Sequence, residues 1–473
     1  MTFRVHDTLS RRLTPVEPLD TGHVRMYTCG PTVWNRVHIG NFRTFIFEDV
    51  LRRWLGRRFA RVTHVMNLTD VDDRIIKNAT AHGHSLDEET APWIAAFFED
   101  RDTLGLRSAH FYPRATEYID EMVDLIERLV AVGAAYRSDG SYYFRIAAFP
   151  EYGRLSGESV SGRVVGASGR IDADDYTKED ARDFALWKAV GPGDIGWDTR
   201  LGRGHPGWHI ECSAMSMTLL GETFDIHCGG VDNIFPHHEN EIAQSEAATQ
   251  KPFVRLWVHS NHLLMAGEKM AKRTGNFETV PESLAAGARA SALRYMLAAS
   301  THYRKPLNYS DEPLSASSEA VDRLSAFRER VARLEPLEDV ERRDKAVLTV
   351  VRETRNGFDE ALDDDLNLPE AMGTVFTGLR EMNRILDSGG VSAQTQIGLR
   401  HLLGDVDDVL GVFPLVDREQ EIALSDEEQR LLDARAKARA DGDYALSDRI
   451  REQLAQCGIA VEDTPQGQRA RRT

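Results

Sequence analysis

The chain has 473 residues and a formal net charge of −17, and 41% of its residues are hydrophobic and 28% charged. This composition is typical of a globular protein with several structural units. The acidic balance argues mildly against a dedicated nucleic-acid binder, although a local basic surface can act within an acidic molecule. No run is apolar enough to cross a membrane, and residues 1–14 lack the apolar stretch of a secretory signal, so we expect a cytoplasmic protein.

Strand and helix patterns alternate through the first half of the chain. Residues 24–29 predict a strand that ends at a Gly-Pro turn, and apolar residues four apart predict a helix from His38 to Trp54. Residues 62–68 predict a second strand, and residues 119–130 predict a helix with one apolar face. This alternation predicts the fold class: an α/β protein with a Rossmann-type parallel sheet and helices on its faces.

The alternation is interrupted once and then gives way to helices. Short strand candidates at 142–145 and 184–187, with Gly/Ser loops, predict an insertion. Beyond Glu312 the pattern is almost wholly helical, as in a bundle, with a linker around Phe413-Pro414 and a small last unit. The four bundle helices are predicted at 316–335, 343–362, 369–387 and 394–411. The predicted units are a catalytic domain at 1–132 and 204–265, an insertion at 133–203, a lysine-loop region at 266–315, the bundle at 316–420 and the C-terminal unit at 421–473.

Two segments have the features of phosphate-binding elements. The first, residues 29–41, lies between a strand and a helix start, where free N–H groups and the helix dipole suit phosphate. Within it, Gly40 allows close approach of a ligand, and His38 and Asn41 could donate hydrogen bonds to a transferring phosphoryl group. The H-x-G-N pattern alone is a weak signal, and a structural role is about equally compatible with it.

The second segment is a basic loop, Lys269-Met270-Ala271-Lys272-Arg273-Thr274-Gly275-Asn276. Its cations could neutralise the charge that builds on a triphosphate when pyrophosphate leaves. In isolation such a loop is more often a solvated basic surface. Both segments together, in this order on either side of an α/β region, indicate nucleotide chemistry much more strongly than either one.

The side chains of a possible metal site are spread over the catalytic half. His237 and Glu241 stand four apart on a predicted helix, which places them on one face, and this ligand pair suits zinc. Cys29 ends the first predicted strand and is a candidate third ligand. Cys212 and Cys228 compete for the fourth position, and spacing alone does not decide between them. The alternative for each residue is structural, as an exposed polar face or a small buried thiol.

These motifs together resemble those of the cysteinyl-tRNA synthetases, a family of class I aminoacyl-tRNA synthetases. The resemblance spans nearly the whole chain, and motifs of this length in this order are very specific. It rests on the segments 29–33, 38–41, 67–73, 207–215, 235–241, 269–277, 302–304 and 458–467.

The resemblance implies a zinc ion, one per chain, held by Cys29, Cys212, His237 and Glu241, and it selects Cys212 over Cys228. It implies that the thiolate of the substrate cysteine binds this ion. Such a bond would discriminate between cysteine and the nearly isosteric serine, because zinc prefers a soft thiolate to a hydroxyl. No long segment then needs assigning to an editing domain.

The resemblance also implies a substrate set and the residues that bind it. The implied reaction uses ATP, with Mg²⁺, to convert L-cysteine into cysteinyl-adenylate and then charges tRNA(Cys); the bundle and the last unit are implied to contact the tRNA. We expect a monomer. The implied amino-acid pocket consists of Cys29, Thr69, Trp208, His227 and Asp232. The implied ATP-binding residues are Thr32, His38, Gly40, Asn41 and Lys272, and the implied catalytic residues are His38, Asn41, Lys269 and Lys272.

The chain departs from the family pattern in two places, and other functions compete. The loop reads Lys-Met-Ala-Lys-Arg-Thr where the family usually has Lys-Met-Ser-Lys-Ser-Leu, and the C-terminal segment lacks a tryptophan common in the family. The nearest alternative is a related cysteine ligase of thiol-cofactor (mycothiol) synthesis, which uses an aminosugar acceptor. A non-catalytic RNA-binding paralogue and a simple nucleotidyltransferase are further alternatives, but they leave the ligand set or the C-terminal half unexplained.

Overall fold

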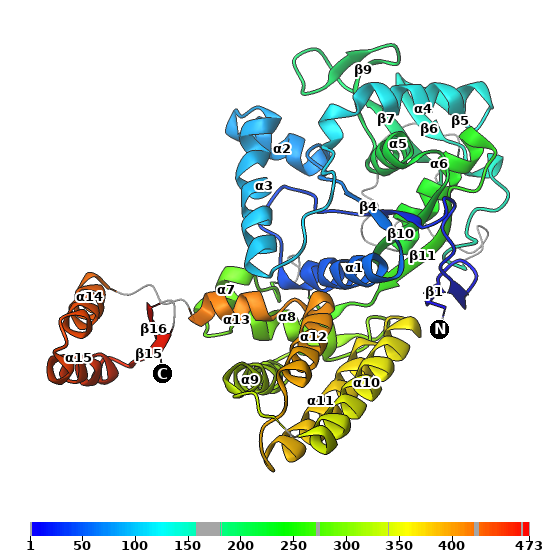
Figure 1. Ribbon diagram of the computed structural model, residues 1–473. Coiled ribbons are helices and arrows are strands. Elements are labelled where there is room, and N and C mark those ends of the chain that lie inside the picture. The colour runs from blue at the N-terminus through cyan, green and yellow to red at the C-terminus, as the bar shows by residue number, and fades with distance from the viewer. Residues whose placement is uncertain are drawn as a thin grey trace.

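The computed structural model describes residues 2–157, 180, 182–270, 275–338, 340–420, 425–464 and 467–472. Its centre is a four-stranded parallel sheet in the order β11-β10-β3-β4 (Figure 1). The strands are β3 (His23–Thr28), β4 (Arg61–Met66), β10 (Phe224–Gly230) and β11 (Val254–Ser260). This sheet confirms the predicted α/β class, and the predicted strands at 24–29 and 62–68 differ from β3 and β4 by one or two residues at their ends. A hairpin of β1 (Arg4–Asp7) and β2 (Arg12–Pro15) precedes the sheet.

Helix α1 (Ile39–Arg58) separates the sheet from the helical half of the molecule. His38 caps its N-terminus by accepting a hydrogen bond from the Asn41 backbone N–H, and basic residues occupy its last turn. Its sides are buried nearly all round, including the fully buried Trp54, as expected for a helix packed between two layers. This helix was predicted correctly from its apolar spacing.

The opposite face of the sheet is covered by α4 (Ile119–Ala131), α5 (Trp208–Leu220) and α6 (Glu239–Thr249). The predicted helix at 119–130 is confirmed, but the prediction that Val130 belongs to its apolar face was wrong, because this side chain is 40% exposed. The buried face ends at Leu129. Two further helices, α2 (Asp73–His82) and α3 (Leu86–Thr103), follow β4, and α3 is followed by the short turn η1 (Ala115–Glu117).

The predicted insertion is a five-stranded antiparallel sheet in the order β5-β6-β7-β9-β8. It lies at the top of the molecule in Figure 1, beside α4 and α5. Its strands are β5 (Ala135–Ser138), β6 (Ser141–Phe144), β7 (Phe184–Ala189), β8 (Trp197–Thr199) and β9 (Gly202–Pro206), with the turn η2 (Ile146–Ala148) after β6. The predicted strands at 142–145 and 184–187 are therefore confirmed with shifted ends.

After β11 the chain forms a small mixed sheet and turns into helices. The sheet has the order β13-β12-β14 and consists of β12 (Leu263–Met265), β13 (Glu268–Lys269) and β14 (Leu307–Tyr309). Between β13 and β14 lie α7 (Val280–Ala285) and α8 (Ala290–Ala299). The apolar side of α8 packs with α1 in a shared core, which links this region to the catalytic sheet.

The helical bundle occupies the lower half of the molecule in Figure 1. The four predicted helices are confirmed as α9 (Asp311–Arg333), α10 (Glu341–Asp363), α11 (Leu368–Leu386) and α12 (Ala393–Leu410). The predicted linker around Phe413-Pro414 was wrong, because these residues begin a further helix, α13 (Phe413–Gln420). Proline is compatible with the first turn of a helix, and the Phe413 side chain is buried, so this segment packs on the core instead of bridging solvent.

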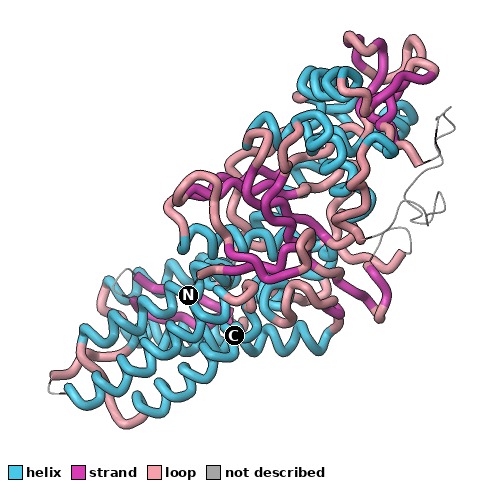
Figure 2. Tube along the Cα trace, turned by 90° about the vertical axis from the view of Figure 1, so that its right-hand side faces the viewer, coloured by secondary structure: helices cyan, strands magenta, loops and turns pink. Residues whose placement is uncertain are grey.

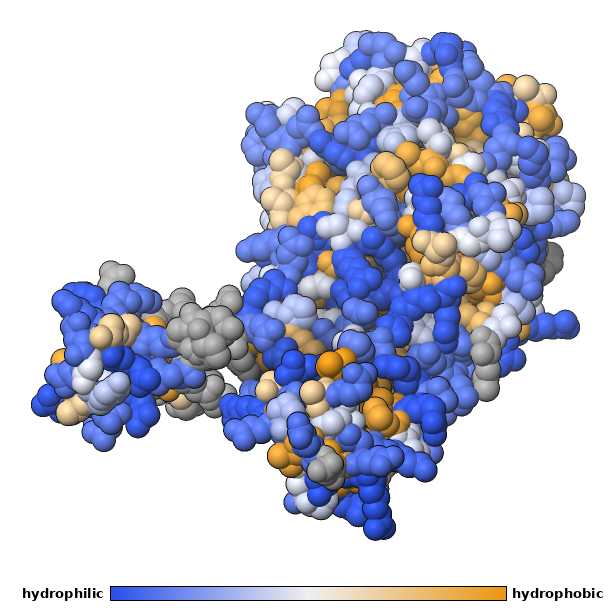
Figure 3. Space-filling model, in the orientation of Figure 1, coloured by the Kyte–Doolittle hydropathy of each residue, from blue (hydrophilic) through white to orange (hydrophobic). Residues whose placement is uncertain are grey.

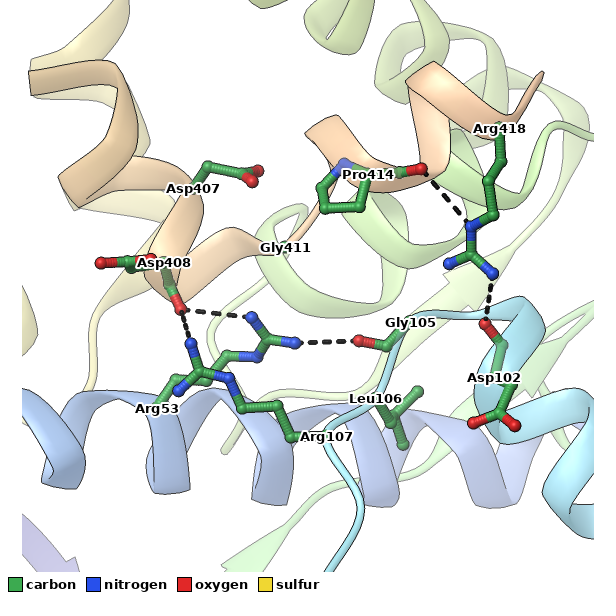
Figure 4. A pocket seen from close by; sticks show the side chains of 10 residues that line it. All are labelled: Arg53, Asp102, Gly105, Leu106, Arg107, Asp407, Asp408, Gly411, Pro414 and Arg418. Atoms are coloured by element: carbon green, nitrogen blue, oxygen red, sulfur yellow. Dashed lines mark hydrogen bonds between the residues drawn. The ribbon is translucent and has the colours of Figure 1, made fainter. Parts of the chain in front are cut away.

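Arginines join α1 to the end of α12. Arg53 donates to the carbonyl oxygens of Asp408 and Gly105, and Arg107 also donates to the carbonyl of Asp408 (Figure 4). They line a cavity of about 410 Å³ between the catalytic half and the bundle. Arg418 of α13 donates to the Asp102 carbonyl on the other side of this cavity. The two halves are thus joined by guanidinium groups that satisfy backbone carbonyls at helix ends.

The C-terminal unit stands apart from the body as a small lobe, and its visible surface is mainly hydrophilic (Figures 1 and 3). It consists of α14 (Asp426–Ala440), α15 (Tyr444–Gln456) and a hairpin of β15 (Ile459–Thr464) and β16 (Gly467–Arg472) around its own small core. The side view shows an elongated molecule with the bundle and the insertion at opposite ends (Figure 2). Among the described residues, no helix combines the length and the apolar character needed to span a membrane.

Candidate active site and metal centre

The site lies at the carboxyl edge of the parallel sheet, where β3 gives way to a tight loop. The Cys29 N–H donates to the Cys228 carbonyl at 3.3 Å, and the Gly30 N–H donates to Asn67 Oδ1 at 2.9 Å. A Cβ atom on Gly30 would lie 1.8 Å from the Asn67 carbonyl oxygen. Only glycine fits here, and the loop therefore holds the Cys29 thiol at the strand end against the loop that follows β4.

Four side chains predicted as metal ligands meet at this edge. Cys212 lies in the second turn of α5, and His237 lies in η4 (Ile234–His238), an irregular turn that leads into α6, where Glu241 is found. His237 Nε2 is 3.1 Å from Glu241 Oε1, and one ligand atom from each of Cys29, Cys212, His237 and Glu241 lies within 4.8 Å of the others. The helix predicted to carry both His237 and Glu241 begins only at Glu239, and Phe235 has extended backbone angles. His237 and Glu241 nevertheless lie close together, as predicted.

Burial makes this cluster unfavourable without a cation. The Glu241 side chain is fully buried, and burial raises its pKa well above the usual value. Among the described residues, none forms a hydrogen bond with Glu241 Oε1, because His237 Nε2 is near it but not in hydrogen-bonding geometry. Burial likewise raises the pKa of the Cys29 thiol, with further contributions from Cys212, and burial lowers the pKa of His237. A cation would stabilise the thiolate and carboxylate forms and occupy the orphaned oxygen. Two sulfur donors, one nitrogen and one oxygen fit a tetrahedral ion, so the cluster could hold a metal.

Other histidines surround the cluster, and the prediction from the sequence missed two of them. His238 Nε2 lies 3.2 Å from Cys29 Sγ, and His238 Nδ1 lies 2.8 Å from His259 Nε2. His227, predicted to lie in the pocket, has Nε2 at 2.9 Å from Glu241 Oε2. Cys29, His227, His238 and Glu241 form a second possible ligand group, which shares two members with the first. His238 lies within the segment 235–241 and His259 lies near the end of β11, but nothing in the spacing of either residue marks it as part of the site.

The sheet register separates Cys228 from this group. Cys228 pairs with Thr28 and His227 pairs with Tyr27 across β10 and β3. Because side chains alternate between the faces of a strand, Cys228 points to the face opposite His227. There it packs in the core that α1 shares with the bundle. Cys228 belongs to neither of the ligand groups at this edge.

Four further side chains lie near the predicted ligands. Asn67 Nδ2 donates to Thr69 Oγ1 at 3.1 Å, and Thr69 donates onward to the buried Glu211 Oε2, also at 3.1 Å. The Trp208 ring stacks on the His237 ring with centroids 4.3 Å apart. Burial raises the pKa of Glu211 well above its usual value. Glu211 was not predicted as a site residue, and its position beside Cys212 in the sequence carries no signal of this contact.

The two segments predicted to bind phosphate meet at the start of α1. Thr32 pairs with Thr69 through a backbone bridge, and His38 pairs with Thr279 in the same way. A Cβ on Gly40 would lie 2.9 Å from His38 Nδ1, and Asn41 is exposed. The Ile39 N–H donates to the Glu278 carbonyl at 2.8 Å and the Asn41 N–H donates to His38 Nδ1 at 3.3 Å, so the segment that follows the lysine loop contacts this helix start.

The lysine loop comes from the other side of the site. Lys269 Nζ donates to Asp232 Oδ2 at 3.0 Å, which ties the loop to the residues that follow β10. Met270 Cβ lies 3.4 Å from the Cβ position on Gly40, so the start of the loop reaches the start of α1. The predicted catalytic residue Lys272 lies outside the described residues.

Comparisons with known proteins agree with this geometry. The family model described as "tRNA synthetases class I (C) catalytic domain" matches residues 15–319, the "DALR domain" matches 357–414, and the "Cysteinyl-tRNA ligase anticodon binding domain" matches 422–471. The cysteine–tRNA ligase of Protochlamydia amoebophila is 43% identical, over 99% of this chain and 98% of its own. The chain belongs to the cysteinyl-tRNA synthetase family. The cysteine–tRNA ligase of Solibacter usitatus is 44% identical over the full length of both chains.

Solved structures show the same fold with little sequence identity. Mycobacterium tuberculosis methionyl-tRNA synthetase in complex with methionyl-adenylate has a TM-score of 0.59 at 17% identity, over 85% of this chain and 95% of its own. A putative arginyl-tRNA synthetase from Campylobacter jejuni has a TM-score of 0.52 at 12% identity, over 85% and 93% of the two chains. This cysteinyl-tRNA synthetase family member therefore has the class I synthetase architecture.

Proposed function

We propose that this member of the cysteinyl-tRNA synthetase family activates L-cysteine with ATP and transfers it to tRNA(Cys), with the cysteine side chain selected at the Cys29 cluster. The observation that supports this most is the group of two thiols, an imidazole and a carboxylate at the carboxyl edge of the sheet. The Trp208 ring stacks on His237 of this group, and Thr69 donates to Glu211, the neighbour of Cys212 in the chain. A cysteine bound there would have its carboxylate directed toward the nucleotide elements.

We propose that the resident ion is zinc, held by Cys29, Cys212, His237 and Glu241. Zinc takes mixed sulfur, nitrogen and oxygen ligands, whereas Mg²⁺ and Ca²⁺ require oxygen donors. This set is favoured over the one with two further histidines because it includes both thiols, which suit the softer ion. Bound zinc would supply a soft Lewis acid for the substrate sulfur, which a serine hydroxyl could not match.

In the first step, the cysteine carboxylate attacks the α-phosphorus of ATP, the bond to the leaving pyrophosphate breaks, and cysteinyl-adenylate forms. His38 and Asn41 at the start of α1, together with Gly40, would hold the phosphates, and Thr32 would lie beside the nucleotide. Lys269 and Lys272 would stabilise the negative charge on the transferring group, with Mg²⁺ accompanying ATP. The ion pair between Lys269 and Asp232 would hold the loop close to the amino-acid pocket.

In the second step, a terminal ribose hydroxyl of the tRNA attacks the acyl carbonyl and releases AMP. Positioning of the tRNA end supplies most of the rate, without a dedicated protein base. The bundle and the C-terminal lobe would hold the tRNA, since the lobe matches a model described as an anticodon-binding domain. The reaction needs reduced thiols at Cys29 and Cys212, which supports a place in the reducing cytoplasm.

The test is aminoacylation of bulk tRNA with labelled cysteine, with serine as competitor, on the wild type and on Cys212→Ser. The variant is expected to lose zinc, measured by atomic absorption, and to lose discrimination against serine. Cys457→Ser is the matched control, because this thiol is exposed on the C-terminal lobe. Full zinc content in Cys212→Ser would remove Cys212 from the ligand set, and failure of the wild type to charge tRNA would contradict the proposed function. An aminosugar acceptor in the same assay tests the related thiol-cofactor ligase.

A further inference from the structure

A second group of potential ligands lies at the turn between α2 and α3, on elements that contribute no ligand to the cluster at the sheet edge (Figure 1). His82 is the last residue of α2, His84 follows it after Gly83, and Glu89 lies in the first turns of α3. Both histidine rings direct Nδ1 at the same carboxylate oxygen, Glu89 Oε2, at 2.9 and 3.0 Å. The family resemblance assigns no role to these residues.

The backbone on both sides holds this arrangement in place. Gly83 ends α2 in the left-handed conformation, with φ of 69°, which turns the chain between the two histidines. Ser85 begins α3 with a capping box, in which its side chain and that of Glu88 satisfy each other's backbone N–H groups. Two capped helix ends therefore present three ligating side chains from a segment of eight residues, and no large rearrangement is needed to bring them together.

The spacing of the three ligand atoms suits a transition-metal ion. Zinc lies about 2.0–2.1 Å from nitrogen and oxygen ligands, so tetrahedral geometry separates neighbouring ligand atoms by roughly 3.3 Å. The observed separations of 2.9 and 3.0 Å need to open by only a few tenths of an ångström. Each ring would bind through the Nδ1 lone pair and carry its proton on Nε2, and Glu89 is a carboxylate, its pKa lowered chiefly by the hydrogen bond from His82.

We propose that His82, His84 and Glu89 form a second, surface metal site that binds a divalent transition-metal ion such as Zn²⁺. Two imidazoles and one carboxylate favour zinc, cobalt or nickel over Mg²⁺ and Ca²⁺, which take oxygen ligands. The imidazole side chains are 56% and 47% exposed, whereas the Glu89 side chain is only 6% exposed. The ion can therefore enter and leave from solvent, and water completes its coordination. The bound ion would clip the end of α2 to the first turns of α3.

This clip would act on elements that contact the loop before His38. Arg74 of α2 lies over the Trp34 ring at 4.6 Å, and Arg36 donates to Asp100 of α3 at 3.0 and 2.6 Å. Trp34 and Arg36 belong to the loop that joins β3 to α1. A metal ion bound at this surface site can therefore stabilise the packing of α2 against α3, the two helices that contact this loop.

The experiment is isothermal titration of Zn²⁺ into the purified full-length holoenzyme, without an affinity tag and after removal of loosely bound metal. The wild type is expected to take up one further exchangeable ion per chain, and Mg²⁺ is expected to give no binding. His82→Asn and His84→Asn, made separately, should each weaken this binding at least tenfold. His401→Asn is the matched control, because it removes an exposed histidine from α12.

Melting curves show whether each variant is folded, and Zn²⁺ should raise the melting temperature of the wild type and of His401→Asn but not of the other two. A wild type that binds no further ion would overturn the proposal, as would unchanged affinity in both His82→Asn and His84→Asn. Metal content before titration reports on the cluster at the sheet edge. The two sites are therefore tested independently, and failure of one leaves the other standing.

Discussion

The buried arginine of α8 offers the sharpest test of how the catalytic half is joined to the bundle. Arg294 is fully buried and donates to Asp49 Oδ2 of α1 at 2.6 Å, to the Leu410 carbonyl at the end of α12 at 2.6 Å and to the Leu104 carbonyl at 2.9 Å. Arg53 binds the same carboxylate oxygen at 2.7 Å. The substitution Arg294→Met keeps an unbranched side chain of similar length but removes all three hydrogen bonds.

The expected loss of stability in Arg294→Met comes from the polar groups that stay buried without their donor. Two carbonyl oxygens lose a charged donor, at about 1–3 kcal/mol each, and breaking a buried ion pair costs about 3–5 kcal/mol. The ion-pair cost is smaller than this, because the Asp49 carboxylate still pairs with Arg53 and still accepts a hydrogen bond from the Arg107 backbone N–H. We therefore expect Arg294→Met to lower the free energy of unfolding by about 3–5 kcal/mol.

The destabilisation depends on pH. Burial raises the pKa of Asp49, but the guanidinium groups of Arg294 and Arg53 outweigh burial, and the net pKa is below its usual value. A carboxyl group with a lowered folded-state pKa stabilises the protein above its unfolded pKa of about 3.9, and this contribution is lost as pH falls through the folded value. The difference between wild type and Arg294→Met should therefore be largest near neutral pH and shrink as pH falls below about 4.

The assay is denaturant unfolding at several pH values, combined with hydrogen exchange at the end of α12. The Gly411 N–H bonds the Asp407 carbonyl beside Arg294, so it should exchange faster in the variant. Arg289→Met is the matched control: it lies just before the same helix but is 35% exposed, and its ion pairs should contribute at most about 1 kcal/mol. Equal unfolding midpoints for wild type and Arg294→Met, or equal losses in both variants, would refute the reasoning.

Three shorter predictions concern the site. Gly30→Ala places a Cβ 1.8 Å from the Asn67 carbonyl, so we expect loss of amino-acid activation by more than a hundredfold in pyrophosphate exchange; near-normal exchange would contradict the tight turn. Lys269→Ala removes the ion pair with Asp232 and should slow adenylate formation at least tenfold while zinc content stays normal, and a fall in zinc would instead indicate a structural role. Glu241→Gln should weaken zinc binding at least about tenfold in a chelator competition, since even loss of a group that only supports a ligand costs that much, and unchanged retention would exclude this carboxylate as a ligand.

The sequence by itself determined the order and nature of the main elements, because apolar periodicity and turn residues act locally. The strand at 24–29, the helix that begins after His38 and the four bundle helices followed from spacing alone. The two predicted nucleotide elements could also be delimited in the sequence, since a strand-to-helix turn and a basic loop are each continuous in the chain, and their binding roles stay predictions. Phe413-Pro414 was misjudged as a linker because packing on the core, and not local composition, makes that segment helical.

Only the tertiary structure decided which distant side chains meet. Spacing left Cys212 and Cys228 open, and the pairing of Cys228 with Thr28 sends that thiol to the other face of the sheet. The contact of Glu211 with Thr69 and the buried network of Arg294 were likewise invisible, because each joins residues more than a hundred positions apart. The periodicity of apolar residues indicates which face of its own helix or strand a side chain occupies. Strand register and helix packing determine which other residues that face contacts.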